Sequence, residues 1–132
     1  MPTTATIGYT LAGSNVPALA ASTALSVGGM GGPGRVALTG SGTYVCDVAF
    51  LPSAGAKGIV VLLDAVDDNG NNVTAPITIR RVVNGVTIND ELSAAAGVGG
   101  FFGIASPSPT HATTALSILY TAACVVHVYI LG

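Results

Sequence analysis

The fold of this chain is decided by its most apolar stretch, TALSILYTAACVVHVYIL at residues 114–131, which carries no formal charge. Apolar residues recur at every second position in two runs, Leu116–Tyr120 and Cys124–Ile130, separated by Ala122 and Ala123. A membrane helix needs about 20 apolar residues, so this stretch would be barely long enough and would also bury His127. Period-2 alternation and β-branched residues instead predict two core strands.

Three other segments of the sequence also predict strands. TATIGYTL, residues 4–11, alternates between apolar and small polar residues and predicts a half-buried strand. KGIVVLLDAV, residues 57–66, is nearly continuously apolar and predicts a central strand buried on both faces. Asn84-Gly85 suits a type I′ turn, so we expect a hairpin that pairs Ile77–Val83 with Val86–Asn89.

Other segments give weaker signals. Residues 12–34 are rich in Gly, Ala and Ser, and predict a long connection with a helical turn after Asn15 or one short strand near Ala24–Val27. NDELSAAAG, residues 89–97, carries helix-capping signals and predicts one or two helical turns. Residues 97–111 predict a loop, or a strand flanked by loops, that carries Phe101-Phe102.

Together these elements predict an all-β chain. We expect one domain over residues 1–132, a β-sandwich or jelly roll of about eight strands with at most short helical turns. Residues 1–15 are expected to form an extended N-terminal contact arm.

The low charge of the chain restricts its partners. Charged residues make up 8% of the sequence, against about 25% in typical soluble domains. The four basic residues and the net charge of −2 argue against binding to nucleic acid or to an anionic membrane surface. A sparsely charged surface is poorly protected from self-association, which favours a protein covered by partner subunits.

No group of residues predicts catalysis or a cofactor. The oxygen-rich segment DAVDDNGNN, residues 64–72, departs from the calcium-loop pattern because Ala65 stands where an acid is needed. It predicts a solvated turn, with a weak calcium or carbohydrate site as the alternative. His111 and His127 are expected to have structural or surface roles, since no nucleophile motif accompanies them.

Two further pairs of residues have structural interpretations. Cys46 and Cys124 lie in alternating apolar runs and are expected to be buried reduced thiols, with a disulfide as the alternative. Adjacent strand residues face opposite sides, so only one of Arg80 and Arg81 can point inward. The inward one needs a carboxylate partner or a subunit interface.

These observations favour a non-enzymatic structural protein that binds copies of itself and a larger lattice. The candidate interface residues are those of the N-terminal alternating segment and of the phenylalanine pair, namely Thr3, Thr4, Ile7, Tyr9, Phe101 and Phe102.

A short chain with Gly-rich loops, strands to its end and the Thr/Ala-rich start MPTTATIGYTLAGSN resembles small virion proteins of tailed bacteriophages. Capsid decoration (cement) proteins are the nearest type. The resemblance implies trimers or other homo-oligomers on the capsid exterior, assembled in the host cytoplasm and clamping the major capsid protein, without nucleic acid, membrane or cofactor. The rival interpretation is a carbohydrate- or receptor-binding β-sandwich of a fibre or cell surface. It would use loop residues such as Asp67, Asp68, Asn69 and Tyr44.

Overall fold

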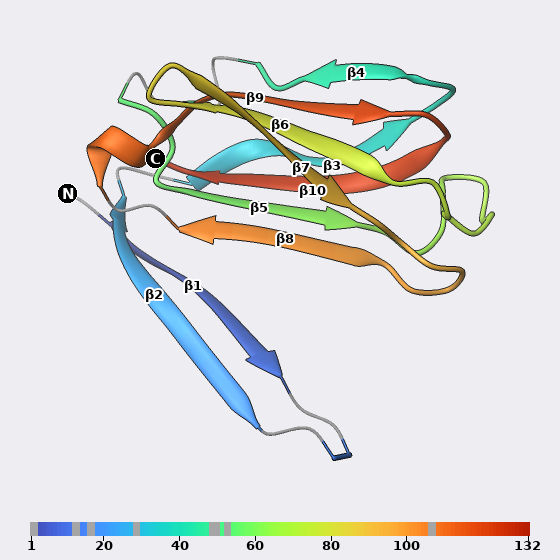
Figure 1. The fold of residues 1–132 in the computed structure, drawn as a ribbon, viewed down its shortest axis with the longest axis horizontal. Helices are drawn as coiled ribbons and strands as arrows, with labels where there is room; N and C mark the ends of the chain where they lie inside the picture. Colours follow the sequence, from blue (N-terminus) through green and yellow to red (C-terminus); the bar gives the residue numbers. More distant parts are fainter. Residues whose placement is uncertain are drawn as a thin grey trace.

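The structure, a computed structural model, describes residues 3–11, 14–15, 18–27, 30–47, 51, 54–105 and 108–132. Its ten strands form two four-stranded antiparallel sheets that face each other, and a separate two-stranded sheet (Figure 1). A short 3-10 turn, Pro109–His111, is the helical element of the described part. The strands are β1 (Thr3–Leu11), β2 (Leu19–Val27), β3 (Met30–Leu38), β4 (Gly42–Val45), β5 (Gly58–Leu63), β6 (Ile77–Val83), β7 (Val86–Leu92), β8 (Gly100–Ala105), β9 (Thr113–Tyr120) and β10 (Cys124–Leu131).

The two large sheets have jelly-roll connectivity. Their strand orders are β3-β10-β5-β8 and β4-β9-β6-β7. The pairs β3–β10, β4–β9, β5–β8 and β6–β7 are therefore nested, each enclosing the next in sequence. A nested double ribbon rolled into two sheets is the jelly roll of eight strands. The predicted all-β sandwich class is confirmed, and we call this eight-stranded body, residues 30–132, the roll.

The apolar stretch at residues 114–131 forms two strands, as its alternation predicted. β9 and β10 lie in opposite sheets and are joined by residues 121–123 (Figure 1). Leu116 and Ile118 of β9 face the core, as do Val126 and Val128 of β10. The chain therefore crosses from one sheet to the other at the predicted break near Ala122.

The predicted central strand and the predicted hairpin are also present. β5 lies between β10 and β8, with Ile59 and Val61 fully buried. Val60 and Leu62, on its other face, are partly exposed, so the predicted burial of both faces is wrong for the outer one. Asn84 and Gly85 have φ angles of 50° and 75°, the positive values that a type I′ turn requires.

The predicted helical turns at residues 89–97 are wrong. β7 continues to Leu92, and Asp90 and Glu91 pair with Ile79 and Thr78 of β6. The capping residues in this segment act locally, whereas the antiparallel ladder continues the hairpin and satisfies the backbone groups along seven residues of each strand. The chain then turns at Gly97, which has a φ of 77°.

The long connection expected within residues 12–34 is corrected by two nine-residue strands, β2 and β3. The helical turn expected after Asn15 falls at residues 16–17, outside the described residues. β2 is a full partner of β1, and β3 pairs with β10. Glycine is needed in β3 because β10 shifts its register between Val128 and Ile130. A Cβ on Gly32, whose φ is 117°, would lie 2.6 Å from the Val128 carbonyl oxygen. The glycines there allow a β-bulge and do not mark a loose connection.

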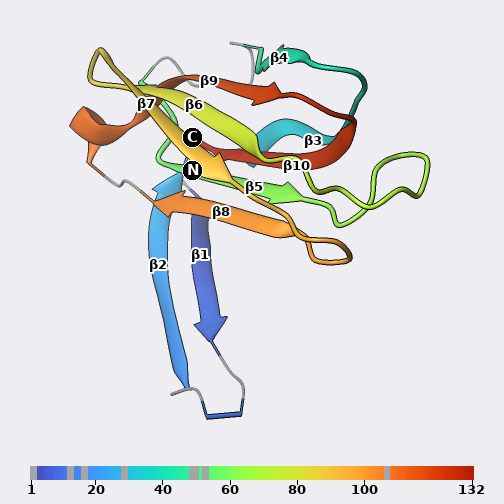
Figure 2. The ribbon, with the colours of Figure 1, turned by 45° about the vertical axis from the view of Figure 1, so that its right-hand side comes forward.

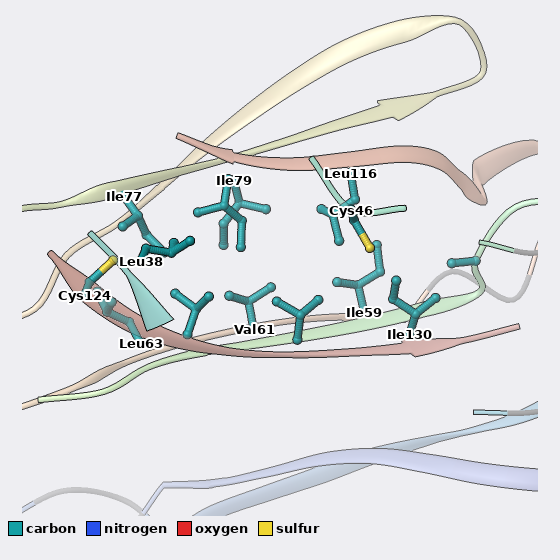
Figure 3. Close-up of a cluster of buried hydrophobic side chains, with 14 of the residues drawn as sticks. Leu38, Cys46, Ile59, Val61, Leu63, Ile77, Ile79, Leu116, Cys124 and Ile130 are labelled. Atoms are coloured by element: carbon teal, nitrogen blue, oxygen red, sulfur yellow. The ribbon is translucent and has the colours of Figure 1, made fainter. Parts of the chain in front are cut away.

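The core fills the space between the two sheets (Figure 3). Ile79 and Ile118 come from one sheet and Ile59, Val61 and Val126 from the other, and each is at most 1% exposed. Close packing of branched side chains from both inner faces is the arrangement expected of a sandwich. Cys46 and Cys124 are buried, free thiols that lie well apart in this core, so the reduced interpretation is confirmed (Figure 3).

Candidate interaction surface

The two-stranded sheet projects from the roll as an arm, which we define as β1, β2 and the residues between them (Figure 2). β1 and β2 pair from Thr3–Val27 to Leu11–Leu19. Within the described residues no third strand joins this sheet, so one long edge of each strand is open. An open strand edge presents backbone N–H and C=O groups to a partner.

The arm carries no charged side chain. Arg35 is the first charged residue of the chain, and all ten Lys, Arg, Asp and Glu residues lie between it and Glu91. Thr4, Thr6 and Thr10 of β1 are exposed, as are Ala20 and Ser22 of β2. The exposed side chains described on β1 and β2 are therefore small, and their polar atoms are hydroxyl groups.

Ile7 anchors the arm to the roll. It packs with Ala105 of β8 and Leu131 of β10, and Leu131 is only 5% exposed. The Ile7 Cγ2 methyl also lies 3.9 Å from the point that a Cβ on Gly103 would occupy. β1 therefore touches the outer face of the sheet β3-β10-β5-β8 near the end of β8.

Beside this anchor, an apolar patch lies on the same outer face. Tyr129 of β10 pairs with Val60 of β5, and Leu62 of β5 pairs with Phe101 of β8. Directly paired residues share a face, so these four side chains form a group, which we call the outer patch. Phe101 and Tyr129 are 53% and 38% exposed, and Val60 and Leu62 are half-buried.

Two pairs of a basic and an acidic side chain border the outer patch. His127, next to Leu62 across the strands, lies with Nε2 3.1 Å from a carboxylate oxygen of Asp64. Arg35, the β3 partner of His127, donates from Nη2 to Asp68 Oδ1 at 2.6 Å. The basic groups at this border thus face carboxylates of the same chain.

The oxygen-rich segment forms the predicted turn. Asp67 Oδ1 accepts hydrogen bonds from the backbone N–H groups of Asn69 and Asn71, each at 2.9 Å. Gly70 has a φ of 83°, and Val66 and Asn72 close the turn by a β-bridge. In the part of the chain that the structure describes, no three His, Cys, Asp or Glu side chains come together as a metal site.

Arg80 and Arg81 face opposite sides of β6, as the strand geometry predicts. Arg80 is exposed and donates from Nε to Asn89 Oδ1 at 2.9 Å. Arg81 points inward with a side chain only 11% exposed, and its Nε lies 3.4 Å from Asp90 Oδ2. The inward arginine therefore has a carboxylate partner within its own hairpin.

Burial raises the pKa of both cysteine thiols. For Cys46, desolvation is the larger cause and the charge of Asp47 adds to it, whereas for Cys124 desolvation is the cause. A raised pKa keeps a thiol protonated and weakly nucleophilic. The two thiols thus behave as core side chains.

The structure places the predicted interface residues in different environments. Thr4 and Phe101 are exposed, Ile7 is the anchor of the arm, and Phe102 packs against the core. The side chains of Thr3 and Tyr9 lie outside the described part. Val60, Leu62 and Tyr129 complete the outer patch and were not predicted, although strand alternation marks each of them as facing away from the core.

His111 is exposed, and its Nδ1 lies 3.1 Å from the Thr110 hydroxyl. His127 pairs with Asp64 on the sheet surface, as described above. Among the described residues, no helix has the length and apolar character to cross a bilayer.

The comparisons with known proteins identify no relative, because no family model, no curated protein and no solved structure matches this chain.

Proposed function

We propose that this chain is a non-enzymatic structural subunit that binds copies of itself and a larger protein lattice, as capsid decoration proteins of tailed bacteriophages do. The jelly roll occurs in viral capsid domains, but also in lectins and cupins, so the fold alone does not choose among functions. The proposal depends on what the fold leaves uncovered.

The observation that supports it is the uncharged arm with two open strand edges. An isolated two-stranded hairpin is marginally stable in water. Exposed strand edges are usually protected by charges, prolines or covering elements, and β1 and β2 have no charged side chain. A long, uncharged hairpin of this kind is readily explained if a neighbouring subunit covers it in an assembly.

Self-association is tested by light scattering after size-exclusion chromatography of the full chain over a range of concentrations. We expect a defined oligomer, and Thr10→Asp with Ala21→Asp should shift it toward monomer, because both residues are exposed on the arm and lie on its two opposite faces. Thr43→Asp with Thr74→Asp, at exposed positions of the roll, is the matched control. A wild-type protein that stays monomeric at all concentrations would contradict the proposal.

Lattice binding is tested separately, in particles purified from cells that express the gene. The chain should co-sediment with the shell protein, and particles that lack it should release their contents at a lower temperature. Its absence from all purified particles would remove the lattice from the proposal and leave only self-association.

A further inference from the structure

We infer that the arm of one chain binds to the outer patch of a second copy of the same chain. This inference rests on the self-association proposed above and specifies its two surfaces. The arm packs on its own roll at Ile7, which contacts Ala105 and Leu131.

Beyond Ile7, the arm leaves its own roll. Figures 1 and 2 both show β1 and β2 diverging from the sheet that contains β8. Ala21 pairs with Tyr9, two positions beyond Ile7, so it lies on the strand face that Ile7 occupies. Ala21 is exposed. Beyond Ile7, this face of the arm therefore carries an exposed apolar position where the arm diverges from its own roll.

The outer patch is the matching surface on the roll. Phe101 and Tyr129 are large, apolar in most of their atoms, and 53% and 38% exposed. Val60 and Leu62 lie between them on the central strand β5. The patch adjoins the point where Ile7 meets the end of β8, so a bound strand would continue an apolar contact that already exists.

The absence of charge on the outer patch favours an uncharged partner. The arm has no charged side chain, and the four residues of the outer patch have none. A charged partner would lose hydration on this patch without finding a counter-charge, because Arg35 and His127 at its border already face Asp68 and Asp64. The arm of a second copy has no charged residue and avoids this cost.

The size of the arm also fits a second copy. β1 and β2 have nine residues each, while a standard interface uses about 20–30 residues on each side. In a twofold dimer, each chain contributes both its arm and its patch, so the contact occurs twice. Such reciprocal binding doubles the contact that one arm alone would make.

The test uses two full-length variants that place opposite charges on the two surfaces. Ala21→Lys changes the arm, and Phe101→Glu changes the outer patch. Each variant alone should raise the dissociation constant by about tenfold or more, because each buries a charge without a partner. An equimolar mixture should associate again, to within about threefold of the wild type, because lysine then meets glutamate across the interface.

Light scattering and sedimentation equilibrium measure the association, and circular dichroism with thermal unfolding verifies that each variant folds. Thr43→Lys mixed with Thr74→Glu, both at exposed positions of the roll, is the control pair and should associate as the wild type does.

Variants that associate as tightly as the wild type, or a mixture that is no better than its components, would overturn arm-to-patch binding while leaving self-association in place. A wild-type chain that is itself monomeric would overturn both.

Discussion

The ring of Phe101 lies across Gly103, so that a Cβ added to Gly103 would be 2.8 Å from Phe101 Cζ. The two residues are separated by one position on β8 and share its outer face. Gly103 thus leaves room for the aromatic ring that forms part of the outer patch, and for the Ile7 methyl beside it.

Gly103→Ala should therefore displace the Phe101 ring and weaken self-association more than it weakens the fold. The ring end can move, so we expect a loss of unfolding free energy of no more than about 1 kcal/mol. The dissociation constant of the oligomer should rise by several-fold, measured by sedimentation. If the free energy of association falls by no more than the free energy of unfolding does, Gly103 acts only through the fold.

Gly99→Ala should destabilise the roll itself. A Cβ at Gly99 would overlap the Leu63 carbonyl oxygen, which is backbone and cannot rotate away. We expect a loss of about 1–3 kcal/mol in urea unfolding, typical of overpacking. Thr74→Ala, at an exposed position of the roll, is the control and should change stability by no more than about 0.5 kcal/mol. An unchanged midpoint for Gly99→Ala would contradict this account.

Asp90→Asn should destabilise the protein because it leaves the inward Arg81 without its carboxylate. The expected loss is about 1 kcal/mol, because the Asp90 side chain is 37% exposed and water screens its attraction to Arg81. Replacing both partners, by Arg81→Met with Asp90→Leu, should recover part of it, because no partly buried charge is then left unpaired. Arg80→Met, on the exposed side of the same strand, is the control.

The two buried thiols should make stability fall at alkaline pH. Their pKa values in the folded protein lie above the ordinary value of 9.0, so the unfolded chain loses these protons first as the pH rises. Their contribution is complete below about pH 9 and declines above it, through the pH at which the folded thiols ionise. Chemical unfolding at several pH values should show a smaller decline in Cys46→Ala with Cys124→Val. Parallel curves would contradict it.

Sequence reasoning succeeded where the signal is local. Asn84-Gly85 specifies its own turn, and the alternation in β9 and β10 is independent of which strands they meet. It failed at residues 89–97 because Asp90 and Glu91 are equally compatible with a helix start and with a strand. Only the pairing with Ile79 and Thr78 decides between them.

The remaining features depend on contacts between distant residues. β2 and β3 are rich in Ala, Ser and Gly, which have little β-propensity, and they become strands through β1 and β10. For the same reason the sequence could suggest a sandwich or a jelly roll but could not order the strands. Phe101 was recognised as an interface candidate as part of the phenylalanine pair, whereas Tyr129 and Val60 join it only because β5 pairs with both β8 and β10.

The nested pairing of the roll also sets an order of events during folding. The β6–β7 pair closes across two residues, while β5–β8 encloses residues 64–99 and β3–β10 encloses residues 39–123. Because the entropy lost on closing a loop grows with its length, we expect the ribbon to zip from the Asn84-Gly85 turn outward. The arm lies outside the outermost pair, and its anchor needs β8 and β10 already in place. A newly made chain would thus complete its own body before its arm could bind a neighbour, an order that limits premature entanglement between nascent chains.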